Sequence, residues 1–176
     1  SGKSSFLRAL GANTVLAHAG APVCADAWTQ RACRLSTSIQ VTDDPGQGLS
    51  RFYAEVRRIR GVLEAVEAAE GDRAARPRLF MVDEMLSGTN SRERHLASRH
   101  IVDRLLAAQR SFGLVTTHDL DLVRVADDDG AAIELYHFSD RFDGEALHFD
   151  YTLKPGRATT TNALHVLRME GIEVPG

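Results

Sequence analysis

The stretch Leu79-Phe80-Met81-Val82-Asp83-Glu84 constrains the fold of this chain more than any other. Its four apolar residues follow one another without a break and end in two adjacent carboxylates. An uninterrupted apolar run of this length is typical of a strand buried on both faces of a parallel sheet. Because charges are costly in a core, we expect Asp83 and Glu84 at the carboxyl edge of the sheet, where open α/β sheets bind their ligands. The two carboxylates could hold a metal ion and activate a water, or they could cap the next helix.

The opening residues Ser1-Gly2-Lys3-Ser4-Ser5 carry the second half of the phosphate-binding loop pattern G-x-x-x-x-G-K-S/T. In that pattern the glycine lets backbone N–H groups approach phosphate oxygens, the lysine reaches the β- and γ-phosphates, and the hydroxyl binds Mg²⁺. A helix that follows would point its positive end at the same phosphates. We therefore expect Lys3, Ser4 and Asp83 to share one nucleotide–Mg²⁺ site. Because the first half of the pattern and its preceding strand are missing, we expect the chain to be a piece of a longer protein, cut within this loop.

Composition narrows the remaining choices. A chain of 176 residues with 43% apolar residues indicates one α/β domain over residues 1–176. No apolar run approaches the roughly 20 residues of a membrane span, so no membrane contact is expected. Cys24 and Cys33 fit no metal-binding spacing and are consistent with reduced thiols in a cytoplasmic protein, the alternative being a disulfide between them. With a net charge of −3 and no dense Lys/Arg run, the chain is not expected to be the main surface for DNA phosphates.

Periodicity and turn residues place the other elements. The segment after the loop Asp43–Gly48 carries an apolar stripe at helical spacing, namely Phe52, Val56, Ile59, Leu63 and Val66. The sequence predicts helices over 4–18, 91–109, 119–126 and 160–171, strands over 36–42 and 112–116, and hairpin strands over 132–138 and 146–153, joined around Asp140–Gly144, with a turn at Pro155-Gly156. His118 follows the strand 112–116, so it is expected beside the carboxylates, where it would sense a γ-phosphate. A histidine in a loop is otherwise usually structural.

The order and spacing of these motifs resemble the ATPase domain of MutS-type mismatch-repair proteins, in the ABC-like branch of the P-loop NTPases. The resemblance covers essentially the whole chain. The matching segments are Ser1–Arg8 (Walker A loop and first helix), Ala19–Val23, Asp43-Asp44 with Ser50, Phe52 and Glu55 (signature segment), Leu79–Glu84 (Walker B strand), Gly88-Thr89-Asn90, Thr116-Thr117-His118 (switch), and Leu164, His165, Val166 and Gly171 (terminal helix).

The resemblance implies an ABC-ATPase-like three-layer fold, with a mostly parallel central sheet and an antiparallel edge hairpin. It implies ATP and Mg²⁺ as cofactors and a homodimer with composite ATP sites, in which the nucleotide state sets the conformation of a clamp on mismatched or branched DNA. The DNA would be bound by domains outside this chain. The residues implied at the nucleotide are Gly2, Lys3, Ser4, Ser5, Ser50 and Asn90, with Ser4 and Asp83 at the metal. Glu84 would polarise the attacking water, His118 would report or stabilise the γ-phosphate, and Ser50 would act on the nucleotide of the other subunit.

Three segments depart from the family pattern. The common G-R-G-T after the catalytic glutamate stands here as Leu86-Ser87-Gly88-Thr89, Ser-Tyr-Gly near the end stands as Thr161-Asn162-Ala163, and Arg51 replaces the common threonine after Ser50. The runs Gly88–Arg94 and Thr160–Ala163 resemble a divergent MutS-like subgroup that keeps the ATPase and can lack a mismatch-reading domain. Three interpretations therefore stay open: a mismatch-repair ATPase, a paralogue ATPase in recombination control or another role, and a nucleotide-binding dimerisation module that barely hydrolyses ATP.

Overall fold

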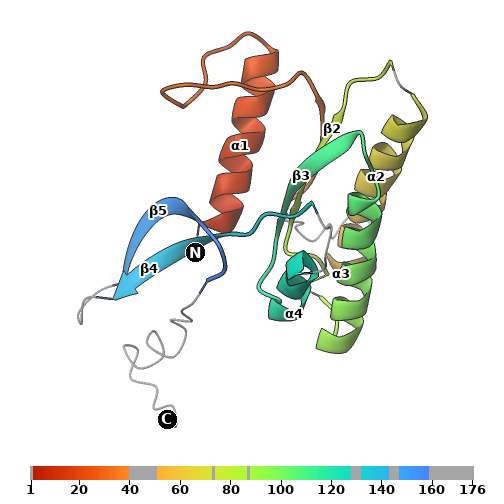
Figure 1. Ribbon diagram of the computed structural model, residues 1–176, viewed down its shortest axis with the longest axis vertical. Helices are drawn as coiled ribbons and strands as arrows, with labels where there is room; N and C mark the ends of the chain where they lie inside the picture. Colours follow the sequence, from red (N-terminus) through yellow and green to blue (C-terminus); the bar gives the residue numbers. More distant parts are fainter. Residues whose placement is uncertain are drawn as a thin grey trace. The chain divides into compact units, whose positions relative to one another are not determined.

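The computed structural model describes residues 2–39, 51–72, 74–86, 88–127, 132–142 and 147–158. The chain divides into two compact units, one spanning Lys3–Ala132 and the other made of Gly2 and the described residues from Ile133 onward. The elements, drawn in Figure 1, are α1 (Lys3–His18), β1 (Arg34–Ser38), α2 (Arg51–Gly71), β2 (Arg78–Asp83), α3 (Ser91–Leu106), β3 (Ser111–Thr116), α4 (Leu120–Val123), the 3₁₀ helix η2 (Arg124–Asp127), β4 (Tyr136–Phe142) and β5 (Leu147–Pro155).

A three-stranded parallel sheet in the order β1-β2-β3 forms the centre of the first unit. Its middle strand is β2, in which Leu79–Val82 are all buried, as the unbroken apolar run predicts. The boundaries of β3 confirm the strand expected there, although Phe112 in β3 is exposed. The strand expected over 36–42 begins earlier, at Arg34, and β1 ends at Ser38. Residues 40–42 lie outside the described residues.

Helices cover both faces of this sheet. On one face, Leu7 and Leu10 of α1 pack with Leu79 and Met81 of β2. The alternate residues Phe80 and Val82 face the other side, because successive side chains of a strand point in opposite directions. Figure 1 shows α2 and α3 on the side opposite α1, and α2 lies against β1 and β2. Its buried residues include the predicted positions Ile59, Leu63 and Val66, whereas Phe52 and Val56 are partly exposed.

The second unit contains the antiparallel pair β4–β5. Among the described residues these strands form a two-stranded antiparallel sheet, as expected for a hairpin, and its expected place at the edge of the parallel sheet stays a prediction. The predicted boundaries were wrong, because Asp140 belongs to β4 and pairs with Phe149 instead of forming the turn. Pro155 likewise ends β5, paired with Tyr136, which is possible because the end of an edge strand tolerates a residue without an N–H donor.

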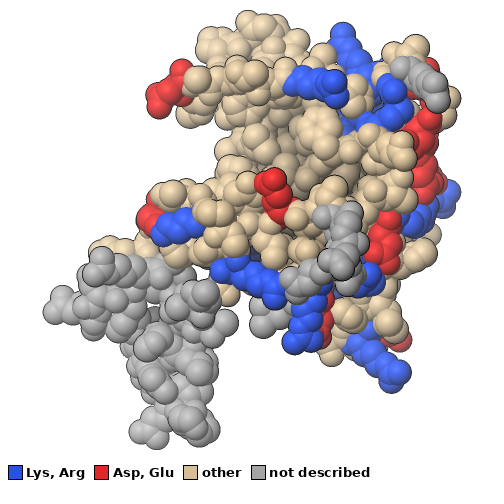
Figure 2. All heavy atoms as spheres, viewed as in Figure 1, with Lys and Arg blue, Asp and Glu red and all other residues tan. Residues whose placement is uncertain are grey.

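Charges of both signs lie side by side on the surface of the first unit. Figure 2 shows acidic and basic side chains next to one another on the right, where α2 and α3 run. Arg104 of α3 reaches Glu67 of α2, and Arg60–Glu64 and Arg99–Asp103 pair within single helices. Such exposed pairs add little stability, but they leave this side electrically balanced rather than basic.

No helix in the described part of the chain is long and apolar enough to cross a membrane. Cys24 is exposed, Cys33 is buried among the residues around Leu7, and both thiols are free. The helix predicted over 160–171 lies outside the described residues.

Candidate functional site

The carboxyl ends of β2 and β3 bring the predicted polar residues to one edge of the sheet. Asp83, the last residue of β2, pairs in register with Thr116, the last residue of β3. The Thr116 hydroxyl donates a hydrogen bond to Asp83 Oδ1 at 2.6 Å. The Glu84 N–H lies 3.2 Å from both the Thr116 hydroxyl and the Thr116 carbonyl oxygen. Thr116 therefore fixes the position of both consecutive carboxylate residues.

Glu84 turns the chain sharply away from the strand. Its φ of +44° lies in the left-handed region, and Leu86 follows with a φ of +59°. A residue other than glycine enters this region only at a cost, so the surrounding contacts must hold both residues there. As a result, the Glu84 side chain is 44% exposed directly after a run of buried residues. The backbone turn thus presents the carboxylate to solvent at the sheet edge.

His118 links this carboxylate to the start of the chain. It lies in the loop between β3 and α4, and its Nε2 is 2.5 Å from Glu84 Oε1. Lys3 Nζ lies 3.3 Å from both ring nitrogens. A carboxylate can only accept a hydrogen bond, so we assign a proton to Nε2, which donates to Glu84. Nδ1 then accepts from Lys3.

The first turn of α1 adds donors beside this cluster. Gly2 has a φ of +102°, which only glycine adopts easily, and Lys3 begins the helix immediately afterwards. Ser4 is half-buried and Ser5 is exposed in the same turn. The N–H groups of the first turn and the positive end of a helix favour anions at this position. The turn that holds Ser4 and Ser5 therefore has the polarity that an anion needs, and the role of these residues and of Gly2 at a phosphate stays a prediction.

Two other predicted residues have different outcomes. Asn90 caps α3, because its side-chain oxygen accepts from the Glu93 N–H at 2.9 Å. Its role at a nucleotide of the dimer stays a prediction, as does that of Ser50, which lies outside the described residues.

Sequence reasoning gave no role to the Thr116 hydroxyl, because a contact between neighbouring strands depends on a register that the sequence did not provide.

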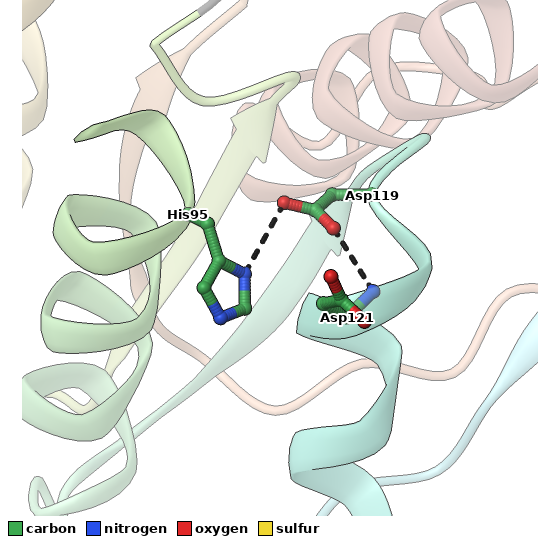
Figure 3. A group of neighbouring side chains, drawn as sticks. All are labelled: His95, Asp119 and Asp121. Carbon is green, nitrogen blue, oxygen red and sulfur yellow. Dashed lines mark hydrogen bonds and ion pairs between the residues drawn. The ribbon is translucent and has the colours of Figure 1, made fainter. Parts of the chain in front are cut away.

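A second polar cluster follows directly on His118. Figure 3 shows His95 of α3 pointing at Asp119, whose other oxygen faces the backbone of Asp121. His95 Nδ1 is 3.5 Å from Asp119 Oδ2, and Asp119 Oδ1 caps α4 through the Asp121 N–H at 2.9 Å. Asp121 pairs with Arg124. One possible metal-ligand atom from each of His95, Asp119 and Asp121 lies within 4.8 Å of the others. The helix cap and the pair with Arg124 account for the positions of the two aspartates without a metal. The contact of His95 with Asp119 brings α3 next to the loop that carries His118.

Fold and site together define a mixed α/β protein with a lysine, two carboxylates and a histidine gathered at the carboxyl edge of a parallel sheet. A family model described as MutS domain V matches residues 1–175. The chain therefore belongs to the MutS family, which confirms the resemblance seen in its motifs.

Named relatives agree with this assignment. The chain is 28% identical over 173 residues to a protein named DNA mismatch repair protein MutS from Natronomonas pharaonis, which covers 98% of this chain and 19% of that protein. It is 28% identical over 176 residues to DNA mismatch repair protein MutS 2 of Halobacterium salinarum, covering 99% and 19%. It is 30% identical over 168 residues to the mitochondrial DNA mismatch repair protein mutS homolog of Sarcophyton glaucum, covering 94% and 16%. The chain thus spans about a fifth of the length of such relatives.

Proposed function

We propose that this chain is the ATP-binding and ATP-hydrolysing domain of a MutS-family protein, with the P-loop fold that its motifs imply. The observation that supports it most is the meeting of Lys3, Glu84 and His118 at the sheet edge beside Asp83. Phosphoryl transfer to water requires four groups: an ammonium, a helix N-terminus, a metal-binding carboxylate and a second carboxylate near water.

The donor set fits Mg²⁺–ATP. Lys3 and the N–H groups of the first turn of α1 would hold the phosphates, and the Ser4 hydroxyl with Asp83 would hold the metal. The contact between Thr116 and Asp83 keeps one carboxylate oxygen engaged, which orients the other. When bound, Mg²⁺–ATP supplies the γ-phosphate that is transferred to water and the metal charge that stabilises it.

The chain's own residues would then exchange partners. In this structure His118 donates to Glu84 and accepts from Lys3. A γ-phosphate offers both Lys3 and His118 oxygen acceptors carrying more negative charge, so both would turn to it. The Glu84 carboxylate would then be left to accept a hydrogen bond from a water and to polarise it for attack. Catalysis would be mostly positioning and charge stabilisation.

The first test is Glu84→Gln in the full-length protein. The amide keeps the size of the side chain and can still face His118, but it cannot accept a proton from water. We expect ATP binding to persist while turnover falls by about a hundredfold or more. Turnover is measured as phosphate release, and binding with a non-hydrolysable ATP analogue.

Glu64→Gln, an exposed carboxylate of α2, is the matched control and should change neither quantity. Unchanged turnover in Glu84→Gln would remove Glu84 from the mechanism. Binding without measurable turnover in the unmodified protein would favour the nucleotide-binding dimerisation module instead.

For the whole protein, we propose a role in DNA mismatch repair, the process that the names of the relatives print. We further propose, from the family resemblance, a homodimer in which the ATP state sets the conformation of a clamp on DNA. The alternative is a paralogue ATPase in recombination control or another non-mismatch role. The feature that favours it is the departure from the common G-R-G-T of the family, which stands here as Leu86-Ser87-Gly88-Thr89.

Turnover of the full-length protein with homoduplex, mismatched and branched DNA separates these roles. Stimulation by mismatched DNA supports a repair sensor, and stimulation by branched DNA alone supports recombination control. Turnover that no DNA changes would contradict a DNA-linked ATPase and point to a partner other than nucleic acid.

A further inference from the structure

A buried acid, Glu55, contacts the turn that carries Glu84. Glu55 lies in the second turn of α2, and its side chain is almost completely buried, with a residue exposure of 6%. Glu55 Oε1 accepts a hydrogen bond from the backbone N–H of Leu86, two residues beyond Glu84 and 31 residues along the chain from Glu55. A buried carboxylate is retained at a cost, so its contacts are expected to matter for the local structure.

Glu55 contacts Leu86, a residue whose backbone conformation is unfavourable. Leu86 has a φ of +59°, in the left-handed region that glycine adopts without strain and leucine does not. Its side chain is buried together with that of Met85, so the turn cannot relax by moving outward. A charge-assisted hydrogen bond to its N–H is among the stronger contacts available to a backbone group. It compensates for the conformation that leucine disfavours.

The helix α2 also approaches the β2–α3 loop closely at a second point. A Cβ atom added at Gly88 would come within 3.2 Å of Phe52 Cβ, one turn before Glu55 in α2. The β2–α3 loop is therefore fixed by the first two turns of α2 at two points, Leu86 and Gly88. Glu84, between this anchor and its contacts with Thr116, has its backbone fixed on both sides.

We infer that Glu55 is a positioning residue for Glu84: through the Leu86 N–H it holds the left-handed turn that aims the carboxylate at the γ-phosphate site. This inference rests on the proposed ATPase function. It assigns Glu55, the acid of the signature segment, to the alignment of Glu84, the carboxylate that directly follows β2, within the same chain. Loss of the contact should slow the chemical step without weakening ATP binding, because Lys3 and the first turn of α1 lie on a different element.

The test compares three substitutions of Glu55 in the full-length protein. Glu55→Gln keeps an oxygen that can accept from Leu86, and should keep kcat within about threefold of the unmodified value. Glu55→Asp keeps the charge but is one methylene too short, and should lower kcat by about tenfold to a hundredfold with the ATP-analogue Kd unchanged. Glu55→Leu should do the same if it folds. Glu64→Leu, on the exposed face of α2, is the control and should leave kcat unchanged.

Two further readouts separate positioning from a general structural role. If Glu55 acts through Glu84, adding Glu55→Asp to Glu84→Gln should lower kcat no further than Glu84→Gln alone. Hydrogen exchange of the Leu86 amide should be faster in Glu55→Asp than in the unmodified protein or in Glu55→Gln.

The outcomes are distinct. Normal kcat in Glu55→Asp, or an equal loss of ATP affinity and kcat, would overturn the positioning role. If the unmodified protein turns over no ATP, the proposed function fails. Leu86 exchange then still decides whether Glu55 holds the turn, and exchange that is unchanged in Glu55→Asp would show that it does not.

Discussion

Thr116 connects the two carboxylates of the candidate site through one hydroxyl. The hydroxyl donates to Asp83 Oδ1 and lies within reach of the Glu84 N–H, which also contacts the Thr116 carbonyl oxygen. Removing the hydroxyl would therefore leave Glu84 with a backbone acceptor but would free Asp83 to rotate. If Asp83 holds Mg²⁺, such a change should be seen in the metal dependence of turnover more than in the affinity for nucleotide.

Thr116→Val keeps the branched shape and removes only the hydroxyl. We expect the Mg²⁺ concentration for half-maximal turnover to rise by about tenfold, in the range found for lost contacts to metal ligands. The free energy of unfolding should fall by about 1–2 kcal/mol, because Asp83 loses a partner in a partly buried site. Both are measured on the full-length protein, by Mg²⁺ titration of phosphate release and by denaturant unfolding. Thr116→Ser restores the donor and should restore the metal dependence; a normal Mg²⁺ titration for Thr116→Val would contradict this role.

At single positions, sequence chemistry predicted some of these contacts and missed others. Glu84 and His118 were predicted to lie near each other because parallel strands end at the same edge, and their contact confirms it. The contact of Glu55 with Leu86 could not be predicted, because it depends on how deeply α2 packs against the loop. Asn90 shows the opposite case: a residue matched to a family motif has a visible role as a helix cap, which sequence position alone does not separate from a role in binding.

Among the elements, β3 packs closely against β2 because one of its residues, Gly113, has no side chain. Gly113 pairs in register with Phe80, and a Cβ atom at Gly113 would overlap the Phe80 carbonyl oxygen and ring. The carbonyl is backbone and cannot move aside, so a larger residue would separate the two strands whose ends carry Asp83 and Thr116. A strand glycine of this kind marks a close approach of two backbones.

Gly113→Ala should therefore destabilise the protein, by about 2–3 kcal/mol on the scale of overpacked cores. The opposite sign is expected for Gly61→Ala in α2, where a Cβ atom meets no other atom within 4 Å and alanine favours the helix by about 0.5–1 kcal/mol. Thermal or denaturant unfolding of the two variants side by side provides the comparison. A neutral Gly113→Ala would show that β2 and β3 can move apart freely.

The elements with one clear pattern were predicted best. The unbroken apolar run gave β2, and the spacing of Ile59, Leu63 and Val66 gave the buried face of α2. The hairpin was predicted less well, because alternation over 132–138 fixes no starting point. The register shift between Phe138 and Asp140 moves residues of turn-forming type into the strand. Such boundaries depend on pairing between strands, which local sequence does not encode.

For the whole molecule, the proposed homodimer would share its ATP sites between two subunits, each site combining Lys3 of one chain with Ser50 of the other. Ser50 immediately precedes α2, the helix whose first two turns hold the β2–α3 loop at Leu86 and Gly88. Contact of a partner's nucleotide with the start of α2 would therefore reach Glu84 within the same chain. This arrangement predicts that two inactive variants can complement each other.

Lys3→Ala and Ser50→Ala should each abolish most turnover as homodimers, because each removes a component of both sites. In a mixed dimer one site combines the intact Lys3 of one subunit with the intact Ser50 of the other, while the second site carries both substitutions. Random mixing makes half of the dimers mixed, so turnover should recover to about one quarter of the unmodified value if sites act independently in a two-fold dimer. Lys3→Ala mixed with Ser4→Ala is the control: both residues belong to the same side of the site, so no mixed dimer has an intact site and turnover should stay low. Differently tagged chains show that subunits have exchanged. If they have exchanged and neither mixture recovers turnover, the shared site is contradicted. If both mixtures recover turnover equally, the variants were not defective within a single site.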